Sequence, residues 1–281
     1  MVIDVTGTMS QTHDLPNTEQ LRRFRTDGFL GPIDLMSPAE MAGLRPQIDE
    51  VLTTPGRAPA PSAEQSQGRL SSLVAQRDGG SPVPFIECRH LDSPIVHRLC
   101  THPRLLAVAR ALYGDDLLLW RSTFIAKASG GPEFRWHQDW GGVHAPGDEY
   151  GLEPPLLFTF WIALSEVTED NGCLQFVPGT RAVLPARPSN AGARATLLVE
   201  DDVADASKAR PVPLRPGQFV VFTDRALHAS GPNTSGAERL GLAVRFTLPA
   251  VAVRGHFPGH ACMVASGTDR VGLNTLVAPP V

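Results

Sequence analysis

The chain has 281 residues, and its 25 lysines and arginines against 29 aspartates and glutamates give a formal net charge of −4. This balance argues against nucleic-acid binding, which favours a basic excess, and the sequence holds no apolar run long enough for a membrane span. The N-terminal segment lacks the features of a signal peptide, and the four cysteines form no C-x-x-C pair. We therefore expect a cytoplasmic protein with free thiols.

The first part of the chain has the pattern of helices. Residues 17–27 predict a short helix capped by Asn17 or Thr18, and Ser37-Pro38 predicts a second helix that runs to about residue 52. A segment rich in Pro, Gly, Ser and Ala follows at 53–82, which we interpret as a long surface loop and a candidate lid. A third helix is expected from Pro94 to about residue 112.

From residue 117 the pattern changes to strands. Residues 117–128 are apolar and extended, and 157–164 and 239–248 alternate with a period of two. Asn171-Gly172 predicts a hairpin between 157–164 and the next strand, CLQFV. Helices followed by strands with Gly and Pro turns favour a mainly β fold, a barrel or jelly roll with flanking helices. We expect a single domain over 1–281, helical at 17–113, with the barrel core at about 117–250.

The motif H-x-D, which can supply two metal ligands, occurs twice. In the first copy, His90-Leu91-Asp92, the carboxylate and Ser93 precede Pro94 at a helix start, where we expect them to cap the helix. In the second copy, His137 and Asp139 lie in an extended segment, so their side chains point the same way.

A third ligand must come from elsewhere, and the best candidate is His228, 91 residues after His137 at the end of an apolar strand. Two histidines and one carboxylate on one face of a metal form the facial triad of non-haem Fe(II) oxygenases. We therefore predict that His137, Asp139 and His228 bind a metal and are catalytic.

The strand that begins at Arg239 has one face of small residues between two arginines, Arg239 and Arg245. This face predicts a cavity lined for an anion, because a guanidinium donates two parallel hydrogen bonds to a carboxylate. The alternative is that the arginines face solvent and the bulky opposite face is the core.

Four separated segments, in this order, carry a resemblance to a known family: LRRFRTDGFL, WHQD, WIALSEVTEDNGCLQFVPGT and HASGPNTS, with Arg239 eleven residues after His228. Over roughly residues 17–250 the chain resembles the phytanoyl-CoA dioxygenase family of Fe(II)- and 2-oxoglutarate-dependent oxygenases. The resemblance implies a double-stranded β-helix, a cupin-like jelly roll with flanking helices. It also implies Fe(II), 2-oxoglutarate and O2 as cofactor and cosubstrates.

The resemblance assigns residue roles as well. His137, Asp139 and His228 would be the iron ligands, Arg239 would bind the distal carboxylate of 2-oxoglutarate, and Ser230 would hydrogen-bond the same group. The implied reaction is hydroxylation of an unactivated C–H with release of succinate and CO2. Asp139 disfavours halogenation, since related halogenases have a small residue there.

Other outcomes of the same chemistry are desaturation, cyclisation and epimerisation. A cupin-like metal isomerase and a non-catalytic binding barrel are the alternatives from other classes. We expect a small-molecule substrate, with biosynthetic or secondary metabolism as its context, no nucleic-acid or membrane partner, and a monomer or homodimer.

Further candidates flank these motifs. Thr159 shares a strand face with Trp161 that is expected to line the pocket, and Lys127, a rare lysine in an arginine-rich chain, is expected near substrate or cosubstrate. Four substrate candidates lie near the second H-x-D motif, namely Phe134, Trp136, Trp140 and His144, and Arg245 is a fifth, from the arginine-bearing strand face. Phe134 and Trp136 are expected on the strand face opposite His137. A second possible metal group, made of His256, His260 and Cys262, is better explained by chance.

Overall fold

The computed structural model describes residues 15–54, 56, 85–139, 152–188, 197–199, 204–254 and 260–281. Most of the expected loop at 53–82, with its interpretation as a lid, lies outside these residues, as do Trp140 and His144. None of the described helices is long and apolar enough to cross a membrane.

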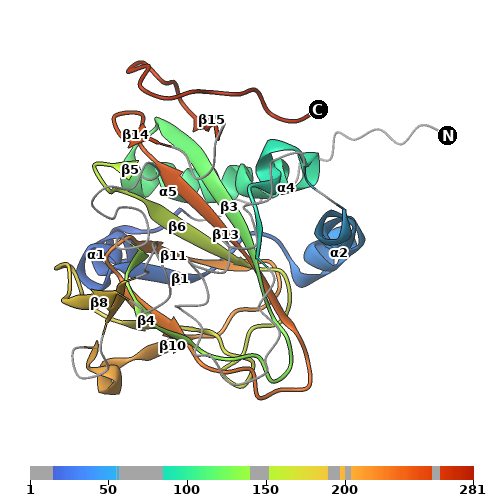
Figure 1. Cartoon of the computed structure of the whole chain (residues 1–281), viewed down its shortest axis with the longest axis vertical. Helices are drawn as coiled ribbons and strands as arrows, with labels where there is room; N and C mark the ends of the chain where they lie inside the picture. Colours follow the sequence, from blue (N-terminus) through green and yellow to red (C-terminus); the bar gives the residue numbers. More distant parts are fainter. Residues whose placement is uncertain are drawn as a thin grey trace.

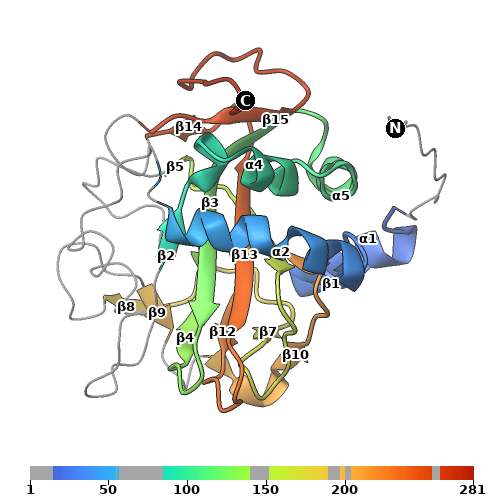
Figure 2. The same ribbon diagram turned by 90° about the vertical axis from the view of Figure 1, so that its right-hand side faces the viewer.

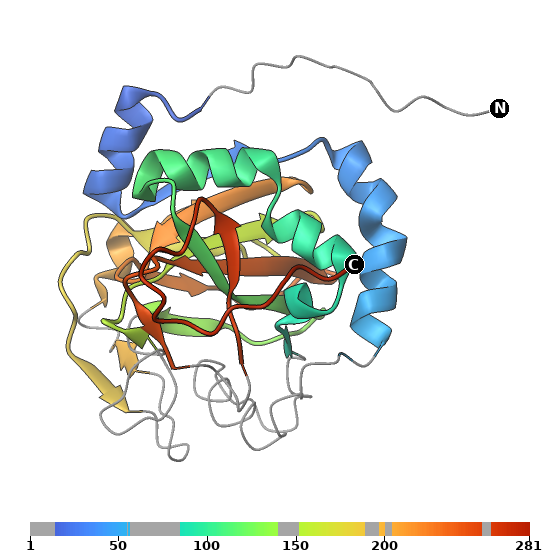
Figure 3. The same ribbon diagram turned by 90° about the horizontal axis from the view of Figure 1, so that it is seen from above.

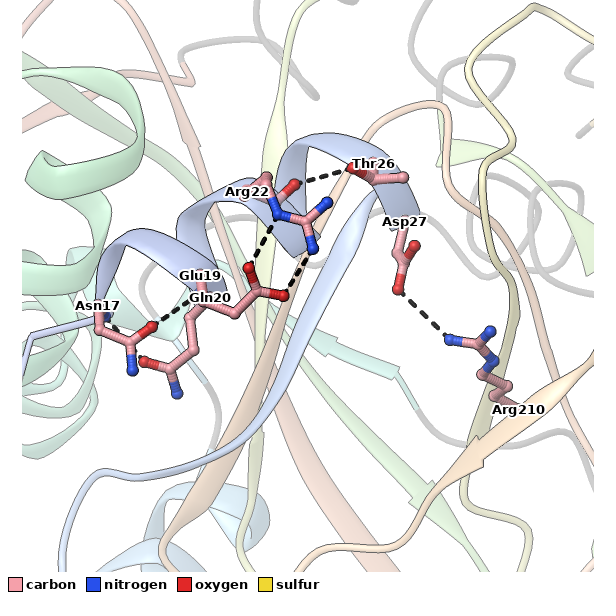
Figure 4. Close-up of polar contacts among 7 residues, drawn as sticks. All are labelled: Asn17, Glu19, Gln20, Arg22, Thr26, Asp27 and Arg210. Atoms are coloured by element: carbon pink, nitrogen blue, oxygen red, sulfur yellow. Dashed lines mark hydrogen bonds and ion pairs between the residues drawn. The ribbon is translucent and has the colours of Figure 1, made fainter.

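The first helix, α1 (Thr18–Asp27), begins at the predicted cap. Asn17 Oδ1 accepts a hydrogen bond from the Gln20 amide at 2.9 Å, and the Gln20 side chain accepts one from the Asn17 amide, so both exposed donors are satisfied (Figure 4). Asp27, the last residue of α1, lies 3.4 Å from the guanidinium of Arg210 (Figure 4). This contact ties the end of α1 to a strand nearly two hundred residues later.

The second helix, α2 (Pro38–Thr53), confirms the predicted start, with a capping box between Ser37 and Glu40. The third expected helix is in fact two, α4 (Pro94–Cys100) and α5 (Pro103–Tyr113). The break falls just before Pro103, because a proline disfavours the helical conformation of the residue before it.

The predicted capping by Ser93 at the first H-x-D copy is wrong, because the Ser93 side chain makes no capping hydrogen bond. Asp92 instead pairs with Arg89 at 2.8 Å, across the short 3-10 helix η1 (Arg89–Leu91). The buried His90 lies 2.8 Å from the hydroxyl of Ser122 through its Nδ1. This copy therefore has a structural role near the helices.

The described strands form two larger antiparallel sheets and a strand pair. The large sheet has the order β1-β11-β6-β13-β3-β15, and β2 also pairs with β3. Its strands are β1 (Phe29–Asp34), β2 (Phe85–Glu87), β3 (Leu117–Lys127), β6 (Phe158–Ala163), β11 (Gln218–Thr223), β13 (Arg239–Thr247) and β15 (Met263–Ser266).

The small sheet has the order β10-β7-β12-β4-β9-β8. Its strands are β4 (Phe134–His137), β7 (Leu174–Val177), β8 (Ala186–Pro188), β9 (Leu197–Val199), β10 (Arg210–Val212) and β12 (Leu227–Ser230). The pair consists of β5 (Leu152–Glu153) and β14 (Ala252–Val253), and a 3-10 helix η3 (Ala206–Lys208) precedes β10. In Figure 1, β3, β13 and β6 lie in the upper part of the molecule, and β4, β8 and β10 in the lower part.

The two faces of β13 have different neighbours. Its bulky face, Leu240, Leu242, Val244 and Phe246, belongs to the largest apolar cluster, together with buried side chains of α2, α4 and α5. Figure 2 shows α2 and α4 in front of β3 and β13, and Figure 3 shows α2 and α5 at the edge of the molecule. The face with Arg239 and Arg245 is therefore turned away from the helices, between the two sheets. The alternative that these arginines face solvent is wrong.

The predicted hairpin at Asn171-Gly172 is also wrong. The turn is present, but β6 belongs to the large sheet and β7 to the small one, so the turn carries the chain between sheets. Gly172 is required here, because its φ is +80° and an added Cβ would lie 2.3 Å from the carbonyl oxygen of Gly231. Two facing antiparallel sheets joined in this way, with helices outside, form the expected jelly roll.

Candidate metal centre and active site

The small sheet brings together the three predicted metal ligands. His137 ends β4, Asp139 follows two residues later, and His228 lies in β12 directly opposite His137 in the strand register. One ligand atom from each of the three side chains lies within 4.8 Å of the other two. The two imidazole centroids are 4.1 Å apart. Strand pairing therefore places residues 91 positions apart on one site.

Hydrogen bonds orient both imidazoles. His137 Nδ1 lies 2.7 Å from the carbonyl oxygen of Arg135, and His228 Nδ1 lies 2.9 Å from that of Ala226. A carbonyl only accepts, so each Nδ1 carries the hydrogen and each Nε2 keeps its lone pair. This is the arrangement that fixes a metal-binding histidine in one tautomer. The donor set and its tautomers thus fit a divalent metal.

The protonation states agree with metal binding. Burial lowers the pKa of His137 to about 3, helped by the neighbouring His228, and burial also lowers the pKa of His228. Burial opposes ionisation of Asp139, but Arg245 and the two imidazoles outweigh it, and the pKa of Asp139 falls to about 2. Near neutral pH the site is therefore two neutral imidazoles and one carboxylate.

Two residues of the large sheet hold Asp139. The hydroxyl of Thr159 donates to Asp139 Oδ2 at 3.0 Å, and Arg245 Nε lies 3.8 Å from the same oxygen. Arg245 also donates to the Thr123 hydroxyl at 3.1 Å. These contacts bridge the two sheets at the candidate metal site and leave the other carboxylate oxygen, Oδ1, for a metal.

Gln138 lies between the two candidate metal ligands of this motif and was not among the predicted site residues. It is buried, and its amide nitrogen donates to the carbonyl oxygens of Ala182 (2.9 Å) and Arg225 (2.6 Å). Its amide oxygen accepts from the Leu184 backbone at 3.0 Å. Gln138 thus fixes the metal-binding segment to two neighbouring loops.

A cavity between the sheets opens onto the three candidate metal ligands. Its lining includes His137, Asp139 and His228 from one side, and Arg239, Arg245, Thr159 and Trp161 from the large sheet. Other lining residues are Arg121, Thr123, Ile125, Phe134, Leu174, Phe222, Ala229, Ser230 and Ala243. The structure therefore brings both predicted arginines, Ser230 and Thr159 to the same cavity as the triad.

Arg239 lies at the closed end of this cavity, with 1% of its surface exposed. Its guanidinium donates to the Gly172 carbonyl at 2.7 Å and lies 5.1 Å from the centre of the Trp161 ring, but its Nε has no hydrogen-bond partner. Burial lowers its pKa to about 10, so it stays cationic near neutral pH. A buried cation with an unused donor is suited to a carboxylate ligand.

Lys127 is paired with Arg239 in the strand register and is fully buried. Its Nζ donates to the Ser230 hydroxyl at 2.8 Å and to the carbonyl oxygen of Gly231, and it lies 4.9 Å from the centre of the Phe134 ring. Burial, with Arg239 nearby, lowers the pKa of Lys127 to about 6. Lys127 does not line the cavity but orients Ser230, which does.

The two described aromatic candidates, Phe134 and Trp136, lie in different parts of the structure. Phe134 lines the cavity on the side of His137, whereas Trp136 packs in an apolar cluster with Val177 and Leu227. The expectation that Phe134 and Trp136 share the face opposite His137 is therefore wrong. The pairing of β12 with β4 shifts by one residue between His228 and Ser230, and such a bulge breaks the period of two.

Arg121 and Thr123 line the cavity although neither was predicted as a site residue. Both share a strand face with Lys127, which is the sequence signal that could have identified them. Gly241 lies beneath Trp161, where an added Cβ would come within 2.0 Å of the ring. The ring occupies the space above this strand, and only glycine leaves room for it.

Among the described side chains, the group His137, Asp139 and His228 alone has the spacing of a metal site. His260 and Cys262 do not join such a group, and His256 lies outside the described residues. A jelly roll with two imidazoles and a carboxylate at one end of its cavity defines the class of mononuclear non-haem metal proteins.

The sequence profile of the phytanoyl-CoA dioxygenase family matches residues 24–241, and the chain belongs to this family. The chain is 28% identical to an ectoine dioxygenase of Bordetella bronchiseptica over 168 residues, which are 59% of this chain and 50% of that enzyme. It thus spans about half the length of that relative. It is 25% identical to the L-proline trans-4-hydroxylase of Streptomyces griseoviridis over 257 residues, covering 84% and 89% of the two chains.

A solved structure shows the same fold. The structure of CytC3 with Fe(II) and alpha-ketoglutarate superimposes with a TM-score of 0.69 at 26% identity, and the match covers 94% of this chain and 93% of CytC3. The jelly roll predicted from the sequence is thereby confirmed.

Proposed function

We propose that this protein is an Fe(II)- and 2-oxoglutarate-dependent oxygenase that hydroxylates an unactivated C–H of a small molecule. The observation that carries the proposal is the His137, Asp139 and His228 group, with ligand atoms within 4.8 Å and both Nε2 atoms free to bind. The proposal is supported by relatives named as dioxygenase and hydroxylase, and by the iron and keto acid named for CytC3.

Each cavity residue then has a task. His137, Asp139 and His228 would hold the iron through one face and leave positions open for ligands. Arg239 would receive the distal carboxylate of 2-oxoglutarate, with Ser230 as a second donor held by Lys127. When bound, iron and 2-oxoglutarate supply the oxidising chemistry, with succinate and CO2 as coproducts.

The remaining residues position and protect this site. Thr159 and Arg245 hold Asp139 in its ionised form, while the buried walls of the cavity keep bulk water from the closed end. Related halogenases have a small residue at the position of Asp139, which leaves room for a halide at the metal. Because this chain has a carboxylate there, we propose oxygen transfer as the outcome. We further propose that the protein is a monomer or homodimer and that its substrate is a biosynthetic metabolite.

The test is spectroscopic. Anaerobic addition of Fe(II) and 2-oxoglutarate should give the weak visible charge-transfer band of a metal-chelated keto acid in the wild type and not in Asp139→Ala. The matched control is Asp92→Ala, in the other H-x-D copy, which should keep the band. A wild type without the band would refute the oxygenase, and a metal-dependent conversion without succinate would instead favour the cupin-like isomerase.

A further inference from the structure

The cavity has a second cationic region besides the one around Arg239. Arg121 and Arg245 face each other in the register of β3 and β13, six residues along each strand from the Lys127–Arg239 pair. At about 3.4 Å per residue the two pairs lie roughly 20 Å apart along the strands. Both Arg121 and Arg245 line the cavity.

The two regions differ in their access to solvent. Arg239 is 1% and Lys127 0% exposed, whereas the side chains of Arg121 and Arg245 are 11% and 14% exposed, close to the 13% of Asp139. The cavity is therefore closed at Arg239 and opens at Arg121 and Arg245. A ligand that enters after 2-oxoglutarate meets the open region first.

The cosubstrate leaves Arg121 unused. A five-carbon diacid is only roughly 6 Å long, so a 2-oxoglutarate that chelates the metal and reaches Arg239 extends away from Arg121. Arg245 is already engaged with Asp139 and Thr123. Arg121 pairs with Glu87 through one terminal nitrogen, and its Nε is buried without a hydrogen-bond partner.

The charge balance points the same way. Three arginines and one aspartate line the cavity, a net charge of 3 − 1 = +2. An Fe(II) ion and a 2-oxoglutarate dianion cancel each other and leave this balance unchanged. Glu87, which pairs with Arg121 without lining the cavity, lowers it to +1. The loaded site would therefore still carry a cationic excess in a region of low exposure, where an uncompensated charge is costly.

We propose that Arg121 is a substrate-binding residue and that the substrate is a small anion, with a carboxylate that Arg121 receives at the open end of the cavity. A guanidinium presents parallel donors to such a group. The anion would be anchored there while the rest of the molecule reaches toward the metal ligands, across the small side chains of Thr123 and Ala243. This inference rests on the proposed oxygenase function.

The test uses the full chain loaded anaerobically with Fe(II) and 2-oxoglutarate, and two acid and amide pairs as probes. These are benzoate with benzamide, and cyclohexanecarboxylate with cyclohexanecarboxamide, followed by ligand-detected NMR. Both acids should bind and both amides should not. Arg121→Gln should raise the Kd of the acids roughly 10- to 100-fold, because a hydrogen bond to a charged group is lost. Arg98→Gln, an exposed arginine on α4, is the matched control and should leave the Kd unchanged.

Two further variants separate binding from folding. Glu87→Gln removes the partner that neutralises Arg121 and should tighten acid binding, a change that structural damage would not produce. The double variant Glu87→Gln/Arg121→Gln has no unpaired acid and should bind the acids as weakly as Arg121→Gln alone. Amides that bind as well as acids, acids that do not bind, or an Arg121→Gln that retains affinity would each overturn the inference. The charge-transfer band, recorded on the same samples, shows separately whether the oxygenase proposal holds.

Discussion

Replacing Arg239 with methionine should weaken 2-oxoglutarate binding without destabilising the unliganded protein. Arg239 is 1% exposed, and no carboxylate lies within ion-pair distance of it among the described residues. Burial lowers its pKa to about 10, which corresponds to a cost of about 3 kcal/mol for holding the charge there. Methionine removes this cost and fills a similar volume.

The interactions that Arg239→Met removes contribute about as much stability as removing the buried charge restores. The hydrogen bond to Gly172 contributes about 1.5 to 3 kcal/mol as a charged pair, and the contact with Trp161 about 1 kcal/mol. The free energy of unfolding of the unliganded variant should therefore stay within about 2 kcal/mol of the wild type. Its binding free energy for 2-oxoglutarate should weaken by about 3 to 5 kcal/mol, or roughly 150- to 4000-fold in Kd, since a buried charge pair is lost.

Urea unfolding with and without 2-oxoglutarate measures both effects in one assay. In the wild type, 2-oxoglutarate at 100 times its Kd should stabilise the metal-loaded protein by about 2.7 kcal/mol, and in Arg239→Met this stabilisation should vanish. Arg98→Met serves as the control, since Arg98 is exposed on α4. A variant that is still stabilised by 2-oxoglutarate would refute the role of Arg239, and an unliganded variant weakened by more than about 4 kcal/mol would refute the stability reasoning.

Further predictions concern the residues around the metal site. Gln138→Ala removes three buried hydrogen bonds and should lower the free energy of unfolding by about 3 kcal/mol, together with metal affinity in a competition titration; unchanged metal affinity would exclude a positioning role. Gly241→Ala places a Cβ within 2.0 Å of Trp161 and should cost about 1 to 3 kcal/mol in urea unfolding, with a changed tryptophan fluorescence; a neutral result would contradict the packing.

Buried histidines should also set the acid sensitivity of the metal-free protein. Burial lowers the pKa values of His90 and His137 to about 3, below the value near 6.5 of an unfolded histidine, so the unfolded state binds more protons below pH 6.5. Stability should be fully present above pH 6.5 and decline as pH falls toward 3. His90→Gln should flatten this decline in pH-dependent unfolding curves, and an equal slope in the variant would contradict it.

The sequence determined the element types and the chemistry of the site, because these depend on local patterns. Period-two alternation marked β6 and β13, and the capping residues at Asn17 and Ser37 marked helix starts. The spacing of His137 and Asp139 predicted a metal site. The arginine after His228 predicted a subsite for a carboxylate, and the resemblance supplied the cofactor names.

Tertiary structure decided what no local pattern encodes. Only the strand pairing shows that the turn at Gly172 joins two sheets instead of closing a hairpin. The same turn sequence can form either connection. The bulge in β4 moved Phe134 to the cavity and left Trp136 in the core, because one extra residue reverses the alternation. Arg121 and Arg245 became neighbours only through the register of β3 and β13, which joins residues more than a hundred positions apart and is fixed by long-range packing.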